Sequence, residues 1–472
     1  MKGDFTRNTF DPAKHYSRVL SQQGRVQLDA DANEQAAILL HYLQTLAADL
    51  IGPSGGPADL LDASNKVLVK RYGFEIIADP KILDDLQKHL PDYDALVGKS
   101  KPPVLIGPGR YYVDGILCEN EGYSAFGNQK DYLALPYPLD NFGAGSKPYL
   151  FYLDVWERHI CAAEVEDPGS HSPSIREVAL DGPDTATRAK VVWQVKAVAL
   201  DKDFSLSVWA DFLAQWQPQD RGLLKARALS QTPVDLSENC IIPPESQYRG
   251  AENQLYRVEI HTGTAKNTHP TFKWSRENGS VIFPIAEVES NGYVLSSLGR
   301  DARSGLEPGD WVEVIDDTVT DQNTIRDLLE VESVDPDASA VYFAQGAAVP
   351  TVDPSAHPYL RRWDQRGSDL AGGIPLSNNW IELEDGVQVQ FHHTSSTIWR
   401  AGDFWLIPAR TATGDVEWPG APDDPEALPP QGVDHHFAPL GRLSVDGNNG
   451  FKVDDFRLAF RPLPEISKKV FP

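Results

Sequence analysis

Cysteine is scarce in this sequence. The 472 residues include three cysteines, Cys118, Cys161 and Cys240. They lie too far apart for a CxxC zinc or redox motif, and they give no disulfide framework. We therefore expect these cysteines to be buried thiols.

Long hydrophobic runs are also missing. No apolar run approaches the roughly 18 residues that suggest a membrane-spanning helix, and the opening MKGDFTRNTF lacks the apolar segment of a secretory signal. We expect the chain to have no direct membrane span. We also expect it to be synthesised in the cytoplasm. A route to the exterior would then be cell lysis, or incorporation into a particle.

Positive charge is in deficit. Lys and Arg number 43 against 68 Asp and Glu, which gives a formal net charge of -25. This balance repels nucleic-acid phosphates and anionic membranes. We therefore expect no nucleic-acid partner, whereas a basic protein surface is compatible with the charge.

Motifs of catalysis are absent as well. The sequence contains no GxSxG, HExxH or GxGxxG, and its SGG and GAGS stretches lack the lysine of a phosphate-binding loop. The pairs His392-His393 and His435-His436 are poor metal ligands, because neighbours in a strand point to opposite faces. We assign no catalytic residue, no cofactor and no metal site.

Two stretches set Glu beside Arg, DVWERH and KWSREN. Such a carboxylate would suit a glycosidase only if a second one lay about 5 to 9 Å away, and the sequence cannot place it. In a chain this acidic, ion pairs along strands are the better interpretation.

A long helix is the clearest element present. The sequence predicts it over residues 32–51, with Asp31 as the N-terminal cap, Glu34 completing a capping box, and Gly52-Pro53 as the stop. Its apolar positions fall on one face, namely Leu39, Leu43, Leu46 and Leu50, widened by Ala36, Leu40 and Ala47. Such a face either packs on its own domain or docks on a neighbouring subunit, and both interpretations remain open.

An irregular polar arm precedes the helix. Its aromatic and charged side chains are so closely interspersed that the arm cannot bury one continuous face on the chain's own core. Aromatic and Arg side chains are enriched at the centres of interfaces. We predict an assembly interface there, made by Phe5, Arg7, Phe10, His15, Tyr16, Arg18 and Arg25. If so, removal of residues 1–20 should leave the rest of the chain folded.

The remainder is rich in strand patterns bounded by turn residues. We expect a mainly β, multi-domain protein of antiparallel sandwich or barrel units behind the N-terminal arm and long amphipathic helix. VLIGPGRYYVDGILCEN reads as a hairpin, a helix starts at Pro80, and SVWADFLAQWQP is a short helix. The predicted divisions are 1–53 (arm and helix), 54–101 (mixed connection), 102–235 and 236–440 (two β-rich domains) and 441–472 (C-terminal extension).

Several passages resemble one family. They include DFTRNTFDPAKHYSRVLSQQGRVQLDADANEQ, YRGAENQLYRVEIH, FKWSRENGSVIFPI and LPPQGVDHHFAPL. The chain is similar over nearly its whole length to uncharacterised bacterial proteins associated with phage tails and phage-tail-like contractile injection systems. Some of these proteins continue into a right-handed parallel β-helix. This chain contains no β-helix repeats, so the glycan cleavage of such spikes is not carried over to it.

The resemblance implies a structural role rather than an enzyme. We expect a component of a contractile tail-like particle, at the baseplate or the fibre attachment region, present in multiple copies. Its partners would be baseplate, fibre or sheath subunits. One alternative is a carbohydrate-binding, adhesin-like module that uses some of the 11 tryptophans, and a glycoside hydrolase is another. Glycan binding would favour the former, and turnover lost with one Glu or Asp would favour the latter.

The absence of a metal motif gives a first prediction. Treatment with EDTA should leave the melting temperature unchanged, because both His-His pairs are treated as ordinary strand or loop residues. Thermal unfolding followed by circular dichroism with and without the chelator measures this. A large drop in melting temperature would reveal a structural metal.

Overall fold

The computed structural model describes residues 1–61, 66–98, 102–132, 136–165, 175–180, 182, 184–229, 248–265, 268–299, 301, 303–446 and 450–461. It confirms a mainly β fold with antiparallel pairing throughout most sheets. Cys118 and Cys161 are buried thiols as expected, and Cys240 lies outside the described residues. No helix in the described ranges is both long and apolar enough to cross a membrane.

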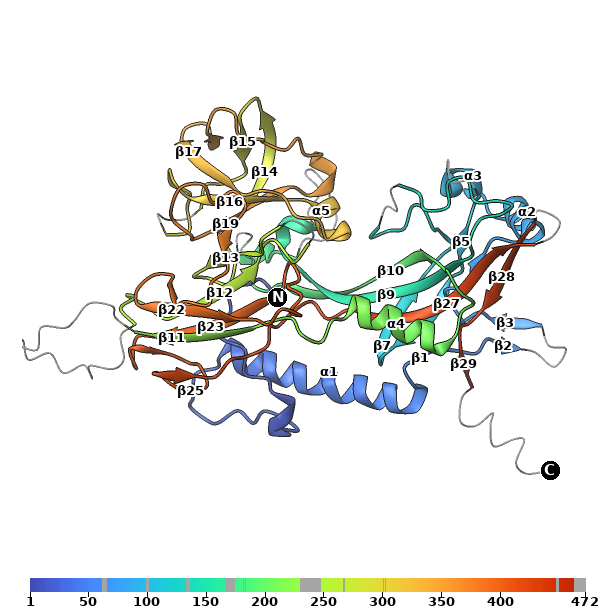
Figure 1. Ribbon diagram of the computed structural model, residues 1–472, viewed down its shortest axis with the longest axis horizontal. Coiled ribbons are helices and arrows are strands. Elements are labelled where there is room, and N and C mark those ends of the chain that lie inside the picture. Colours follow the sequence, from blue (N-terminus) through green and yellow to red (C-terminus); the bar gives the residue numbers. More distant parts are fainter. Residues whose placement is uncertain are drawn as a thin grey trace, which may run out of the picture.

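The first of three β units, which we call the first sandwich, is built from two sheets around a shared core (Figure 1). One sheet has the order β10-β9-β27-β28, with strands β9 (Tyr149–Ile160), β10 (Arg188–Ala199), β27 (His436–Val445) and β28 (Phe451–Asp455). The other has the order β29-β1-β6-β7, with strands β1 (Ser54–Pro57), β6 (Gly109–Val113), β7 (Ile116–Asn120) and β29 (Ala459–Phe460). The predicted hairpin is confirmed, because β6 and β7 meet across Asp114-Gly115, both at positive φ.

A second sandwich also has two sheets around one core. The smaller sheet, β11-β22-β21, consists of β11 (Leu223–Ala228), β22 (Val387–His392) and β21 (Ile381–Glu382). The larger sheet, β20-β13-β12-β23-β24, consists of β12 (Gln254–Ile260), β13 (Thr271–Ser275), β20 (Ile374–Pro375), β23 (Phe404–Arg410) and β24 (Asp415–Val416). Alternation places Leu224, Ala226 and Ala228 of β11 in the core.

A closed barrel is inserted between β13 and β20 of the second sandwich. Its strands, in the order β14-β15-β18-β17-β16-β19, are β14 (Ile282–Glu289), β15 (Gly292–Leu295), β16 (Trp311–Ile315), β17 (Leu329–Asp335), β18 (Ala340–Phe343) and β19 (Tyr359–Trp363). The barrel has its own apolar interior, with Phe283, Val312 and Phe343 among the buried residues. Closure removes the exposed edges of the sheet.

The remaining elements are short, except for the first helix. The helices are α1 (Asp29–Ile51), α2 (Pro80–His89), α3 (Tyr93–Val97), α4 (Leu206–Trp216) and α5 (Asp317–Gln322), with 3-10 turns η1 (Pro12–Lys14), η2 (Ala162–Glu164), η3 (Val178–Leu180) and η4 (Pro354–Ala356). Short ladders join β2 (Leu60–Leu61) to β3 (Val67–Val69), β25 (Gly420–Ala421) to β26 (Asp424–Pro425), and β4 (Ile76–Ile77) to β5 (Leu105–Ile106) and β8 (Ser124–Ala125). The helix start at Pro80 is confirmed, with Asp79 accepting from the Lys81 amide.

Strand pairings cross the expected divisions, two of them between strands that are distant in the sequence. The division at 440/441 falls within β27, which pairs with β9 of the first sandwich. Likewise β11 lies before residue 235 but pairs with β22 of the second sandwich. Both pairings join strands that are far apart in the chain, so no local signal in the sequence marks them.

Helix α5 connects the barrel to the first sandwich. Arg158 on β9 approaches Asp321 of α5 at 3.1 Å and Glu164 at 3.1 Å, and the Gln194 side chain donates to the Asp321 carbonyl at 2.8 Å. Burial raises the pKa of the Asp321 carboxyl to about 7, although Arg158 acts in the opposite direction. The neighbouring carboxylates of Asp131 and Asp317 contribute to this rise in the pKa.

This arrangement predicts a pH-dependent stability. Because the pKa of Asp321 is raised in the folded state, its contribution is most favourable below about pH 4 and is lost as the pH rises to about 7. Asp321→Asn should therefore unfold at higher urea than the parent at pH 8, by on the order of 1–3 kcal/mol, with the difference vanishing near pH 4. Equal stabilities at pH 8 would contradict the raised pKa.

Candidate assembly surface

The start of α1 differs from the sequence prediction. The helix begins at Asp29 rather than after Asp31, its N-cap residue is Leu28, and no side chain caps it locally. Asp31 and Glu34 both lie inside the helix, so the predicted capping box is wrong. The sequence DADANEQ offers several acidic residues that could begin a helix, and contacts with the distant arm decide among them.

The arm holds the start of the helix through the acidic side chains of its first two turns. Asp29 accepts hydrogen bonds from the Thr6 amide at 2.9 Å and the Thr6 hydroxyl at 2.6 Å, and Glu34 accepts from the Thr9 hydroxyl at 2.6 Å. Burial alone would raise the pKa of Asp29, but the bonds from Thr6 lower it. An ionised carboxylate in the first turn also suits the helix dipole.

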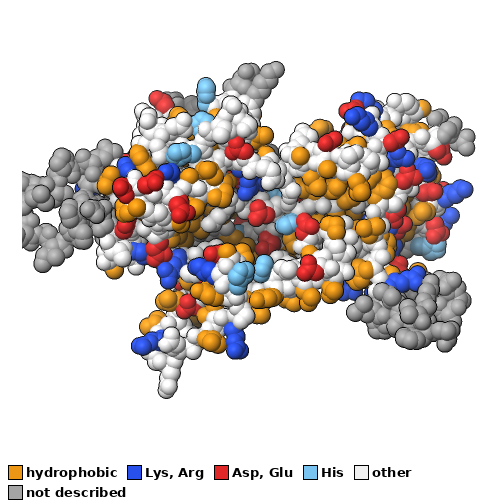
Figure 2. Space-filling view, turned by 60° about the horizontal axis from the view of Figure 1, so that its bottom comes forward, with side chains coloured by type: hydrophobic (Ala, Val, Ile, Leu, Met, Phe, Trp, Pro, Cys, Tyr) orange, Lys and Arg blue, Asp and Glu red, His pale blue; other side chains and the backbone are white. Residues whose placement is uncertain are grey.

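The apolar face of α1 points away from the body of the protein. Four leucines, which we call the leucine stripe, are exposed by 54%, 65%, 56% and 72%, for Leu39, Leu43, Leu46 and Leu50 respectively. The buried residues of the helix are instead Ala30 and Ile38. Figure 1 places α1 along the underside, and Figure 2, with that side turned forward, shows hydrophobic side chains at the surface.

A close backbone contact explains this orientation. The turn between β6 and β7 meets the middle of α1 at Gly115, where a Cβ atom would lie 2.0 Å from the Gln44 carbonyl oxygen. Gly115 also has φ +81, which favours glycine. The backbone of α1 near Gln44 therefore lies directly against this turn, with no room for a side chain at position 115.

The arm residues predicted as an interface divide into two groups. Phe5 lies edge-on to His159 with ring centroids 6.3 Å apart, Arg7 pairs with Glu417 at 3.0 Å, and Phe10 packs on His41. These side chains contact the chain itself. The others are exposed, namely His15, Tyr16, Arg18 and Arg25.

The first residues of the arm enter a buried ionic cluster that sequence reasoning missed. Lys2 Nζ lies 3.0 Å from Glu259 Oε1, and Arg257 Nε lies 2.6 Å from Glu259 Oε2. Asn278 donates to the Gly3 carbonyl at 2.9 Å. Removal of residues 1–20 would take Lys2 away from Glu259 and the Gly3 carbonyl away from Asn278. The structure therefore argues that this deletion would destabilise the fold.

The same cluster joins the second sandwich to the barrel. Lys273 Nζ of β13 lies 2.6 Å from Glu313 Oε2 of β16, whose carboxylate also accepts from the Trp363 indole at 3.0 Å. Burial alone would raise the pKa of Glu313, but Lys273 and Lys2 together lower it to about 2. A carboxylate buried in this way remains ionised only while its cations stay in place.

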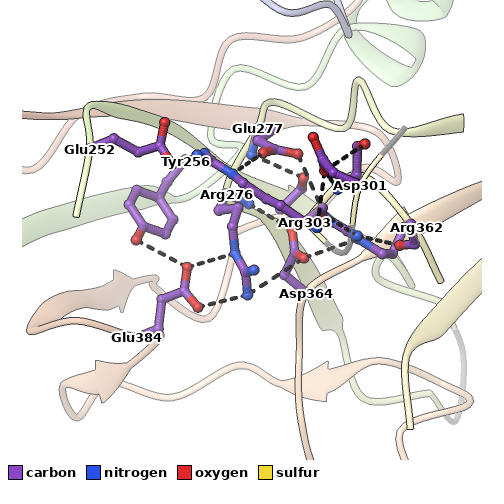
Figure 3. A network of polar contacts seen from close by, with 12 residues as sticks. Glu252, Tyr256, Arg276, Glu277, Asp301, Arg303, Arg362, Asp364 and Glu384 are labelled. Carbon is purple, nitrogen blue, oxygen red and sulfur yellow. Dashed lines mark hydrogen bonds and ion pairs between the residues drawn. The ribbon is translucent and has the colours of Figure 1, made fainter. Parts of the chain in front are cut away.

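Figure 3 shows a second network, which contains the Glu of KWSREN. Arg276 pairs with Glu384 at 2.8 Å, and Arg303 pairs with Glu277 at 2.9 Å and with Glu252. These pairs join separate segments rather than neighbours along a strand. Because arginines bind Glu277 and Glu384, the geometry supports a structural clamp more directly than a glycosidase pair.

The tryptophans offer no exposed aromatic platform. All eleven lie in described parts of the chain, and each is buried or partly buried. Trp363 and Trp405 are among the largest fully buried side chains. Stacking on a sugar ring needs an exposed ring face, which the six buried tryptophans lack.

The two histidines of the pair His435-His436 bind different carboxylates, and His392 of the other pair contacts the Gln390 side chain. His435 Nδ1 lies 2.6 Å from Asp154, and His436 Nδ1 lies 2.9 Å from Asp114. Within the described ranges, no group of three or more His, Cys, Asp or Glu side chains is placed to hold a metal ion.

The chain matches one family over most of its length. The family is described as "Family of unknown function (DUF6519)", the match covers residues 1–215 and 218–453, and the chain belongs to it. No match was found among curated proteins or among solved structures. The resemblance to a family of unknown function is thereby confirmed.

The buried cluster predicts a large effect of a single substitution. Lys273→Met keeps the volume but leaves Glu313 and Glu259 short of a cation, so unfolding should become easier by about 3–5 kcal/mol at pH 7. Urea denaturation measures this. The matched control is Lys147→Met, which breaks an exposed pair with Asp201 and should change nothing measurable. Equal effects of the two substitutions would contradict the role of the cluster.

Proposed function

We propose that this member of a family of unknown function is a structural subunit of a phage-tail-like contractile injection particle, at the baseplate or the fibre attachment region. It works by protein-protein assembly and carries out no catalysis. The observation that supports this most directly is the leucine stripe, which α1 turns away from its own body.

The energetics of exposed leucines favour a covered surface. Burial of one leucine side chain stabilises by roughly 1.5–3 kcal/mol, and monomeric proteins rarely expose large contiguous apolar patches. Four leucines in line on one helix therefore indicate a surface that another protein covers. A helix whose role was to stabilise this chain alone would turn them inward.

The arm supplies the polar part of the same surface. Tyr16 is 57% exposed and lies close in sequence to Arg18 and Arg25, which are also exposed. Aromatic and Arg side chains are enriched where proteins meet. Because Lys2 and Gly3 are held in the buried cluster, the arm is anchored at its start and offers its later residues to a partner.

The expected partners are baseplate, fibre or sheath subunits, with this chain present in several copies. We do not propose glycan binding, because none of the eleven tryptophans is exposed. Synthesis would occur in the cytoplasm, followed by incorporation into the particle and release on lysis.

Co-sedimentation tests the proposal. The intact chain should pellet with sheath-containing particles, and Tyr16→Ser with Arg25→Ser should reduce its share in the pellet several-fold while leaving the melting temperature unchanged. Lys147→Ala serves as a surface control, because Lys147 lies in an exposed pair elsewhere on the molecule, and it should pellet normally. A chain found only free, in lysates where such particles are abundant, would overturn the proposed function.

A further inference from the structure

The leucine stripe has the spacing of a coiled-coil seam. From Ala36 through Leu39, Leu43, Leu46 and Leu50 the intervals are 3, 4, 3 and 4 residues, the pattern of core positions in a heptad. On a straight helix these residues form a narrow line rather than a broad patch. The element that fits such a line best is another helix, whose side chains interdigitate with the leucines.

The rim beside the seam carries almost no charge. On one flank lie Gln35, Tyr42 and Asp49, and on the other lie Leu40 and Ala47. Helix α1 contains no Lys or Arg. Flanking charges are what normally direct a helix to a different partner, and this rim provides one carboxylate. Two identical seams can therefore meet without like charges along their length.

The position of the arm selects an antiparallel pairing. The Val19 amide donates to the Gln35 side chain at 2.8 Å, so the exposed Arg18 lies beside the N-terminal half of the Gln35 flank. In an antiparallel pair equal flanks meet, with Leu43 facing Leu46 of the second copy. Asp49 of that copy then lies about 7.5 Å along the axis from the level of Gln35. The positive charge of Arg18 thereby lies near the negative charge of Asp49 of the second copy.

A parallel pairing would be less favourable. It would place the acidic first turns of two copies side by side, including Asp29 and Asp31, and it would align the two helix dipoles. Arg18 would then be remote from Asp49 of the other copy. Charge therefore favours the antiparallel arrangement.

We infer that the occupant of the leucine stripe is the same stripe of a second copy of this chain, packed antiparallel about a twofold axis. This inference rests on the proposed role of α1 as an assembly element, and it names the partner of that element. The contact is isologous, so it closes at two chains and leaves the tips of both arms available for other subunits.

Sedimentation equilibrium of the purified full chain tests the pairing without any particle. The parent should show twice the 52.1 kDa mass of one chain at micromolar concentration. The double variant Leu43→Glu with Leu46→Glu should shift to the single mass, with unchanged circular dichroism because both side chains are exposed. Leu206→Glu is the matched control, since Leu206 is an 84% exposed leucine on α4, and it should keep the double mass.

The salt dependence of dimerisation distinguishes association through the apolar seam from association through charged side chains. Two chains of net charge -25 repel each other, so association through the stripe should strengthen as salt screens that repulsion. A parent chain that remains monomeric would overturn the inference. A double mass that survives the two glutamates would overturn it as well, because the contact would then lie elsewhere.

Disulfide trapping tests the orientation. In the antiparallel pair, a mixture of Leu43→Cys and Leu46→Cys chains should give more covalent dimer than either variant alone under oxidation, with the parent as background for the native cysteines. No excess in the mixture would overturn the antiparallel arrangement. Failure to pellet with particles, in contrast, bears on the proposed function and leaves the pairing measured in solution intact.

Discussion

Burial of ionised side chains at the junction of the second sandwich and the barrel is the constraint on which the rest of the molecule depends. Glu259 and Glu313 lie between Lys2, Arg257 and Lys273, and each carboxylate needs its cations. Loss of one partner leaves a buried charge uncompensated, which is strongly destabilising. The cluster therefore fixes the barrel on the sandwich and holds the first residues of the arm in one place.

That anchoring determines how α1 is presented. From its fixed start the arm reaches Thr6 and Thr9, which bind Asp29 and Glu34 and hold the beginning of the helix. At its middle, the helix meets Gly115 at backbone distance. With both points set, the helix presents Ile38 to the body and the leucine stripe outward. The proposed assembly role and the proposed pairing both follow from this orientation.

The arm contains both the residues that anchor it to the body and the residues proposed to contact a partner. Substitutions in its two parts should therefore have different effects. Substitutions near residues 2–10 disturb contacts within the chain, as the pairs of Lys2 and Arg7 show. Substitutions at Tyr16, Arg18 or Arg25 leave those contacts in place. Folding and assembly can therefore be separated by position along the arm, whereas deletion of the whole arm would confound them.

The sequence by itself determined the elements whose signals are local. The β-rich character, the Asp114-Gly115 hairpin, the helix start at Pro80 and the C-terminal end of α1 follow from turn chemistry and periodicity over a few residues. Only the tertiary structure decided which strands share a sheet, as β27 with β9, and where buried charges find their partners, as Lys2 with Glu259. Periodicity identified the leucine stripe but not its direction, because an amphipathic pattern has the same period whichever way the helix faces. The close approach of Gly115 to Gln44, 71 residues apart by their numbers, decided that.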